Sequence, residues 1–122
     1  MAQFTSADSS GLIVYTTVTI ANGTSLSPAV DLDKYSLIGI NMPSGWTTAN
    51  LSFQVAHDNS TFNPLNDKTG EIDLASAAAS VYIALDPTVF VGLRFIKLRS
   101  GTNATPVNQG ADRVITLILR AL

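Results

Sequence analysis

The sequence predicts an all-β fold: an antiparallel β-sandwich of about eight strands, of jelly-roll type, with an immunoglobulin-like sandwich as the alternative. Short runs of β-branched and aromatic residues recur along the chain. Turn-forming Gly, Pro, Asn and Asp separate these runs, and no helical stretch exceeds a turn or two. Regularly spaced short strands with such turns are typical of sandwiches and barrels. The cysteine pair of a true immunoglobulin domain is missing.

Residues 46–65 are expected to form one β-hairpin around which the rest of the chain is organised. The odd-numbered residues from Leu51 to His57 are apolar except for the histidine, and the even-numbered ones are polar or small. This period of two predicts a half-buried strand with His57 at the end of its apolar face. Residues 58–61 (DNST) are predicted to form the turn, because their short polar side chains can hydrogen-bond their own backbone.

Further strands are expected at residues 12–20, 25–30, 35–42, 71–74, 80–85, 93–100 and 113–121, with a helical turn at 86–90. Pro28 marks the second of these strands as an edge strand, because proline lacks the N–H that a central strand uses. Gly39 predicts a bulge or a close approach in the third strand. Pro87 suits the first position of a helical turn.

The chain of 122 residues is long enough for one sandwich domain, at residues 12–122, preceded by a flexible polar arm at residues 1–11. Hydrophobic residues make up 46% of the chain and charged residues 13%, against roughly 25% charged in an ordinary domain. Mean hydropathy is +0.27, yet the apolar runs are strand-length, so no membrane span is expected. Because interface centres are depleted of charge, we favour a surface covered by partners over an unusually large core.

Charge and cysteine content exclude several classes of protein. The net charge is −2 and the pI about 5.0, with no run of basic residues, so nucleic-acid binding is not expected. Without cysteine there is no disulfide framework and no thiolate metal site. The first residues lack the basic and apolar regions of a signal peptide, so we expect assembly in a cytoplasm.

Residues that could support catalysis or metal binding are few. His57 is the single histidine, and no G-x-S-x-G motif accompanies it, so a partly buried strand-end histidine is expected rather than a catalytic base. Two groups of carboxylates could offer oxygen ligands to calcium: Asp31 with Asp33, and Asp67 with Glu71 and Asp73. Neither has EF-hand spacing, and turn-forming or solvated carboxylates are favoured. We therefore expect no enzyme, no metal and no cofactor.

Four aromatic residues are candidates for contact with a ligand or a partner: Trp46, Tyr15, Tyr35 and Tyr82. Aromatic rings present large, rigid apolar faces, so the four could form a sugar-stacking platform. Packing in the core or in a protein interface is the favoured alternative.

Several segments in residues 37–119 carry a combined pattern. They are Met42-Pro43 with Trp46, Phe53-Gln54, the LRFIKLRSG run at residues 93–101, and Pro106-Val107-Asn108-Gln109 followed by Arg113. Together they resemble a group of small virion proteins encoded beside the capsid genes of tailed bacteriophages. The resemblance implies a β-sandwich head decoration, or cement, protein that binds the outside of the head and stabilises the shell.

The same resemblance implies the partners and location. A cement protein contacts the major capsid protein and copies of itself, as a trimer at a local three-fold axis or as a dimer, and resides in the virion. Similar modules sit on tail, baseplate or head-fibre parts. Residues 93–100 are also similar to discoidin-type carbohydrate-binding jelly rolls, which would make a host-surface glycan the ligand.

Overall fold

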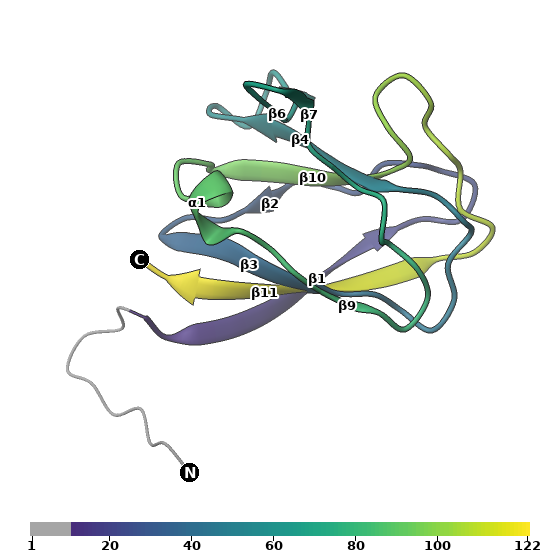
Figure 1. Cartoon of the computed structure of the whole chain (residues 1–122), viewed down its shortest axis with the longest axis horizontal. Helices are drawn as coiled ribbons and strands as arrows, with labels where there is room; N and C mark the ends of the chain where they lie inside the picture. Colours follow the sequence, from purple (N-terminus) through teal and green to yellow (C-terminus); the bar gives the residue numbers. More distant parts are fainter. Residues whose placement is uncertain (1–10) are drawn as a thin grey trace, which may run out of the picture.

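The described residues form two large antiparallel β-sheets that face each other, together with one small two-stranded sheet (Figure 1). The computed structural model describes residues 11–122; the predicted arm, apart from Gly11, lies outside the described residues. The strands are β1 (Ile13–Ile20), β2 (Val30–Asp31), β3 (Tyr35–Asn41), β4 (Leu51–Ala56), β5 (Asn63–Pro64), β6 (Asn66–Asp67), β7 (Gly70–Glu71), β8 (Asp73–Leu74), β9 (Tyr82–Ala84), β10 (Phe95–Ser100) and β11 (Arg113–Ala121), and the helix is α1 (Pro87–Phe90).

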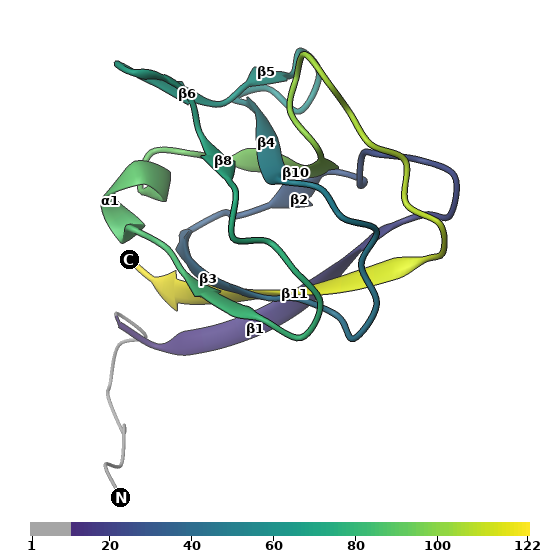
Figure 2. The ribbon, with the colours of Figure 1, turned by 45° about the vertical axis from the view of Figure 1, so that its right-hand side comes forward.

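Apart from the hairpin of β4 and β5, neighbouring strands in both large sheets are distant in sequence. The first, here called the β11 sheet, has the order β1-β11-β3-β9. The second, the β10 sheet, has the order β2-β10-β4-β5, and β8 pairs with the end of β4. The small hairpin β6-β7 lies beyond β4 on the far side of the β10 sheet (Figures 1 and 2).

The strand order is that of a jelly roll. The first strand, β1, pairs with the last one, β11, and β2 pairs with β10. The chain alternates between the two large sheets from β1 to β4, forms the hairpin of β4 and β5 within the β10 sheet, and alternates again from β9 to β11. Such nesting of outer strands around inner ones is the double Greek key of jelly rolls. It differs from the immunoglobulin-like alternative, in which the first two strands are neighbours in one sheet.

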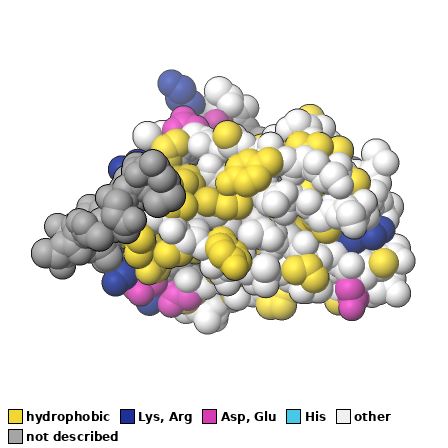
Figure 3. Space-filling view, turned by 90° about the horizontal axis from the view of Figure 1, so that it is seen from below, with side chains coloured by type: hydrophobic (Ala, Val, Ile, Leu, Met, Phe, Trp, Pro, Cys, Tyr) yellow, Lys and Arg dark blue, Asp and Glu magenta, His cyan; other side chains and the backbone are white. Residues whose placement is uncertain are grey.

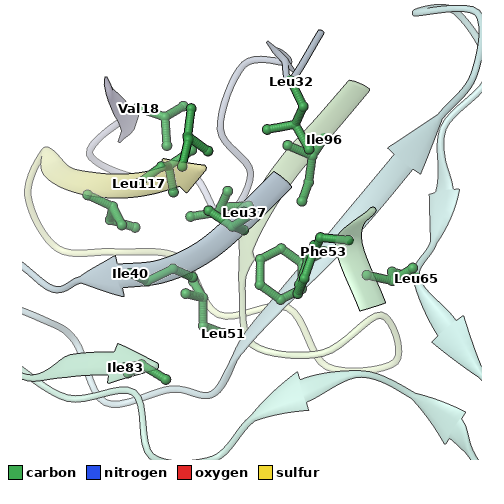
Figure 4. Close-up of a cluster of buried hydrophobic side chains, with 14 of the residues drawn as sticks. Val18, Leu32, Leu37, Ile40, Leu51, Phe53, Leu65, Ile83, Ile96 and Leu117 are labelled. Atoms are coloured by element: carbon green, nitrogen blue, oxygen red, sulfur yellow. The ribbon is translucent and has the colours of Figure 1, made fainter. Parts of the chain in front are cut away.

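The core is formed by the inward-facing alternate residues of both sheets (Figure 4). Leu37, Ile40 and Leu117 project from the β11 sheet toward Phe53 and other side chains of the β10 sheet. Phe53 is fully buried, and its ring meets that of Phe90 edge-on at 5.4 Å between centroids. The predicted hairpin, with β4 paired to β5 across residues 57–62, therefore supplies the centre of the core.

Strand β4 differs from the sequence-based expectation in one respect. Phe53 is buried as expected, but Ser52 and Ala56 on the opposite face are buried too. The half-buried assignment is thus wrong, because Arg99 and the loop at residues 101–110 cover that outer side. His57 is exposed rather than partly buried, since β4 ends at Ala56 and the histidine already belongs to the turn.

The local expectations for Gly39 and Pro87 are confirmed, and the one for Pro28 is only partly met. The pairing of β3 with β11 shifts register beside Gly39, which is the predicted bulge. Pro87 occupies the start of α1, whose N-cap is Asp86. The strand expected at residues 25–30 is reduced to an isolated bridge at Leu26, because Pro28 has no N–H for a ladder; the outer strand β2 begins only at Val30. Within residues 11–122, α1 spans four residues and is far too short to cross a bilayer.

Candidate functional site

The outward surface of the β11 sheet is the best candidate for a functional surface. On β1 and β11 the alternate residues that do not enter the core point outward, and several are large and apolar. Tyr15 is 75% exposed, Ile13 61% and Tyr82 59%, while Val114 is half exposed. We call this surface the outer face; it comprises the outward side chains of β1, β11, β3 and β9 (Figure 3).

The middle of the outer face is a continuous apolar row. Tyr15 pairs with Ile118, and Ile118 pairs with Gly39 on the next strand. The Tyr82 ring reaches over Gly39, where a Cβ atom would lie 3.2 Å from the ring carbon Cε1. Gly39 therefore lets the Tyr82 ring lie against the sheet and extends the row across all four strands.

The outer face carries no charge at its centre. Strands β1, β3 and β9 contain no Lys, Arg, Asp or Glu, and on β11 the arginines Arg113 and Arg120 lie near the two ends. Figure 3 shows apolar side chains in the middle of this face and charged ones toward its margins. An exposed apolar patch with a polar rim is typical of a binding surface.

The four predicted aromatic residues separate into two pairs. Tyr15 and Tyr82 lie on the outer face and are exposed. Tyr35 and Trp46 are half-buried and pack against the core cluster. The Trp46 indole N–H donates to the Ala49 carbonyl at 3.1 Å, which fixes the loop before β4. The four rings therefore do not form one platform, although Tyr15 and Tyr82 share a surface.

A buried polar network fastens the loop at residues 101–110. Gln109 is 1% exposed, and its amide N–H groups donate to the Thr47 carbonyl (3.0 Å) and to the Ser100 hydroxyl (2.7 Å). Its carbonyl oxygen accepts from the Thr47 N–H (2.8 Å) and from Arg113 Nε (3.0 Å). Gln109 and Arg113, which belong to the pattern noted in the sequence, thus have a structural role.

A second network surrounds Arg99 on the outward side of the β10 sheet. Arg99 is 3% exposed and lies 2.6 Å from a Glu71 carboxylate oxygen. Its guanidinium also donates to the Ser52 hydroxyl at 3.0 Å, and to Asn103. Since a buried charge needs a partner and hydrogen bonds, this arrangement holds the hairpin β6-β7 and the loop at 101–110 against the sheet.

His57 and Asp58 follow the end of β4 and belong to the turn that leads to β5. His57 borders an open pocket of about 330 Å³ together with apolar residues such as Val55 and Leu93. The neighbouring Asp58 carboxylate accepts the backbone N–H groups of Thr61 and Ser60, and these bonds hold the pKa of Asp58 below its usual value. Asp58 thus serves the turn, the role that residues 58–61 were predicted to have.

Four of the five candidate calcium ligands, all except Asp33, are engaged elsewhere. Asp31 pairs with Arg94, Asp67 accepts from Thr69, Glu71 pairs with Arg99, and Asp73 accepts from Asn50. Among residues 11–122 no cluster of three or more His, Cys, Asp or Glu side chains is placed to hold a metal ion.

Comparisons with known proteins identify the fold. Neither a protein family nor a curated protein matches the sequence. The crystal structure of the SPBc2 prophage-derived protein YomS matches 88% of this chain and 94% of its own, with a TM-score of 0.55 and 14% sequence identity. A chain of the cyanophage Pam1 capsid asymmetric unit matches over 100% of this chain and 94% of its own, with a TM-score of 0.43 and 11% identity. The likeness to YomS shows a shared sandwich fold.

The apolar residues Ile13, Val114 and Ile118 of the outer face were not singled out from the sequence. A signal for them exists, because residues 12–20 and 113–121 carry apolar side chains at both odd and even positions. An antiparallel sheet with one face in water ordinarily alternates apolar and polar residues. Loss of that alternation indicates a sheet that is apolar on its second face too.

Proposed function

We propose that this protein is a structural component of a tailed-bacteriophage virion, and that it decorates the outside of the head. The sequence resemblance to small virion proteins supports the class, and so does the fold shared with a prophage-derived protein. The apolar outer face, which is uncharged at its centre, is the observation that carries the proposal. In this proposal the outer face binds the major capsid protein, and the protein has no catalytic role and no cofactor.

The physical basis of shell stabilisation is mass action. A ligand that binds the closed shell and not the separated subunits lowers the free energy of the closed shell. Contacts repeated by the symmetry of the head add further through avidity, so each single contact can be modest. Copies of the protein would associate with one another on the shell, as a dimer or as a trimer at a local three-fold axis.

The test is stoichiometric binding of the purified protein to expanded heads of the phage that encodes it. Val114→Ser should weaken binding by up to about tenfold, since fully burying a valine contributes roughly 1.5–3 kcal/mol, about half of that remains for a half-exposed side chain, and each 1.4 kcal/mol is tenfold in affinity. Val91→Ser is the matched control: Val91 and Val114 are both 50% exposed, but Val91 follows α1, outside the outer face.

Equal binding by both variants would contradict the assignment of the outer face. Binding to tails, baseplates or fibres in place of heads, located by electron microscopy, would reject head decoration and support another virion module.

Carbohydrate binding is a second candidate function, favoured by the exposed rings of Tyr15 and Tyr82. Tyr15→Ser should then abolish binding on a glycan array while the melting temperature stays unchanged. Trp46→Ala is a poor test, because Trp46 packs against the core and its loss would also destabilise the fold. Absence of binding across a broad array would reject this alternative.

A further inference from the structure

Among the strands of residues 11–122, β1 is an outer strand that is long and has none of the usual edge protection. It spans eight residues, IVYTTVTI, with no charge, no proline and no glycine. The other outer strands of the two sheets, β9, β2 and β5, have three, two and two residues. Natural proteins shorten or charge such edges, because an exposed row of backbone groups pairs readily with another strand.

The backbone groups that face away from the sheet can be assigned from the register. The Ala121 N–H donates to the Leu12 carbonyl at 2.8 Å, and the pairing of β1 with β11 continues without a shift to Ile20 and Arg113. In an antiparallel ladder the bonded pairs alternate, so the even-numbered residues of β1 bond β11. The odd-numbered residues direct their N–H and C=O groups outward: Ile13, Tyr15, Thr17 and Thr19. Within residues 11–122 no second strand pairs with this edge.

The other edges show the protection that β1 lacks. On β2, Asp31 is ion-paired with Arg94, and Pro28 precedes the strand. On β5, Pro64 removes one backbone donor. The exposed edge of β1 is therefore exceptional in this part of the molecule.

We propose that β1 pairs antiparallel with β1 of a second copy of this chain, about a two-fold axis at Thr16. Paired residues in an antiparallel ladder place their side chains on the same face, so outward-facing odd residues must meet odd residues. One register uses all four of these odd-numbered residues. It places Ile13 opposite Thr19 of the second copy and Tyr15 opposite Thr17. Every outward N–H and C=O then gains a partner, and the two β11 sheets become one continuous sheet.

Charge and side-chain type fit this register. The row through Arg120 and Ile13 continues to Thr19 and Val114 of the second copy, so no like charges face each other. Aromatic and β-branched residues, as at Tyr15 and Thr17, are favourable cross-strand partners. A strand whose outward residues all meet compatible residues when it pairs with itself favours a second copy of the same chain over an unrelated strand. The inference deepens the proposed function by naming the contact between copies, and it rests on that function only for its place on the virion.

The first experiment measures the oligomeric state of the full chain by sedimentation in the absence of phage heads. A dimer is expected. Ile13→Lys with Thr19→Lys places like charges opposite each other at both ends of the pairing and should raise the dimer dissociation constant at least about tenfold. Ile13→Glu with Thr19→Lys changes the same two positions but sets opposite charges against each other, so it should remain dimeric.

A monomeric wild type, or equal behaviour of the two double variants, would overturn the proposal. If the wild type is monomeric and becomes dimeric after deletion of residues 1–10, that segment covers the edge and the second copy does not. Because no heads are present, failure here is distinct from failure of head binding.

A cysteine cross-link tests the register. The chain has no cysteine, so Thr16→Cys supplies one thiol per copy, on the proposed axis. Two strands facing each other at a non-hydrogen-bonded pair place their Cα atoms about 4.5 Å apart, within the range that a disulfide spans. Oxidised Thr16→Cys should run as a covalent dimer, whereas Thr105→Cys in the exposed loop at 101–110 should not. No cross-link at position 16, or equal cross-linking at both positions, would refute the register.

Discussion

Gln109 shows how much one buried side chain can organise at the residue scale. Its amide bonds both the N–H and the C=O of Thr47, and it also bonds Ser100 and Arg113. All four contacts join segments that are distant in sequence or separated by a loop. A buried amide with all its groups satisfied stabilises one specific arrangement, because any rearrangement would leave polar groups without partners.

Gln109→Leu keeps the size of the side chain and removes its polar groups. The Thr47 N–H and C=O then lose their partners, and each unsatisfied buried group costs about 1–3 kcal/mol, so we expect the free energy of unfolding to fall by about 3 kcal/mol. Chemical denaturation provides the measurement. Asn108→Leu is the matched control, since Asn108 is exposed, and a comparable loss in both variants would show that the network contributes little.

The hairpin β6-β7 illustrates the scale of the element. Its two-residue strands are too short to be stable alone, and the ion pair between Glu71 and Arg99 ties it to β10. Arg99 is nearly inaccessible, whereas the side chains of the other ion pair, Arg94 with Asp31, are about half exposed. The first pair is therefore structural, and the second lies in solvent, where ion pairs contribute little.

Glu71→Gln should destabilise the protein, because it leaves the buried Arg99 guanidinium without a counter-charge. Breaking a buried pair costs 3–5 kcal/mol, and the remaining bonds to Ser52 and Asn103 place the expected loss near the lower end, at about 3 kcal/mol. Asp31→Asn is the control at the exposed pair and should leave the melting temperature nearly unchanged. If the two variants melt alike, the ion pair at Arg99 has no special role.

The elements that depend on local chemistry were predictable. The turn at residues 58–61, the bulge at Gly39 and the helical start at Pro87 each follow from the conformational preferences of a few neighbouring residues. The burial of Ser52 was not predictable, because its cover comes from Arg99 and Gly101, more than forty residues away. The two-residue period of apolar residues describes a single strand, whereas the burial of its second face depends on how the whole chain is folded around it.

The candidate site was predictable in the same partial way. Tyr15 and Tyr82 were named from their residue type, and the structure places both on the outer face. That Tyr35 and Trp46 pack against the core follows from strand order and loop path, which the sequence does not reveal residue by residue. The edge of β1 became recognisable only once its neighbour on one side was known to be β11.

At the scale of the whole molecule, acid should weaken the fold through four aspartates. The hydrogen bond from Arg94 lowers the pKa of Asp31, and those from the Thr61 and Ser60 N–H groups lower the pKa of Asp58. In the same way Thr69 lowers the pKa of Asp67, and Thr88 lowers that of Asp86. A folded-state pKa below the unfolded value means that the folded protein binds fewer protons near that pH. The stabilisation is complete above the ordinary aspartate pKa of about 3.9 and is lost as the pH falls through the lowered values.

These four aspartates should therefore cause no change in the melting temperature from about pH 5 to 8, and the melting temperature should decline below about pH 4 as they take up protons. Replacing Asp58, Asp67 and Asp86 together by Asn should flatten that decline, because Asn keeps the turn geometry without titrating. Asp33→Asn is the control, since its carboxylate accepts no hydrogen bond from residues 11–122. An unchanged acid limb in the triple variant would show that other groups dominate.

The pairing of β1 with β11 also determines when the protein can fold. Strand β11 lies between β1 and β3, so the sheet lacks its middle strand until nearly the whole described chain has left the ribosome. Assembly from contacts this remote in sequence is slow compared with that of helical proteins. Nascent chains stalled before residue 113 should accordingly stay sensitive to protease, and chaperones would have to shield their apolar strands until β11 has been synthesised.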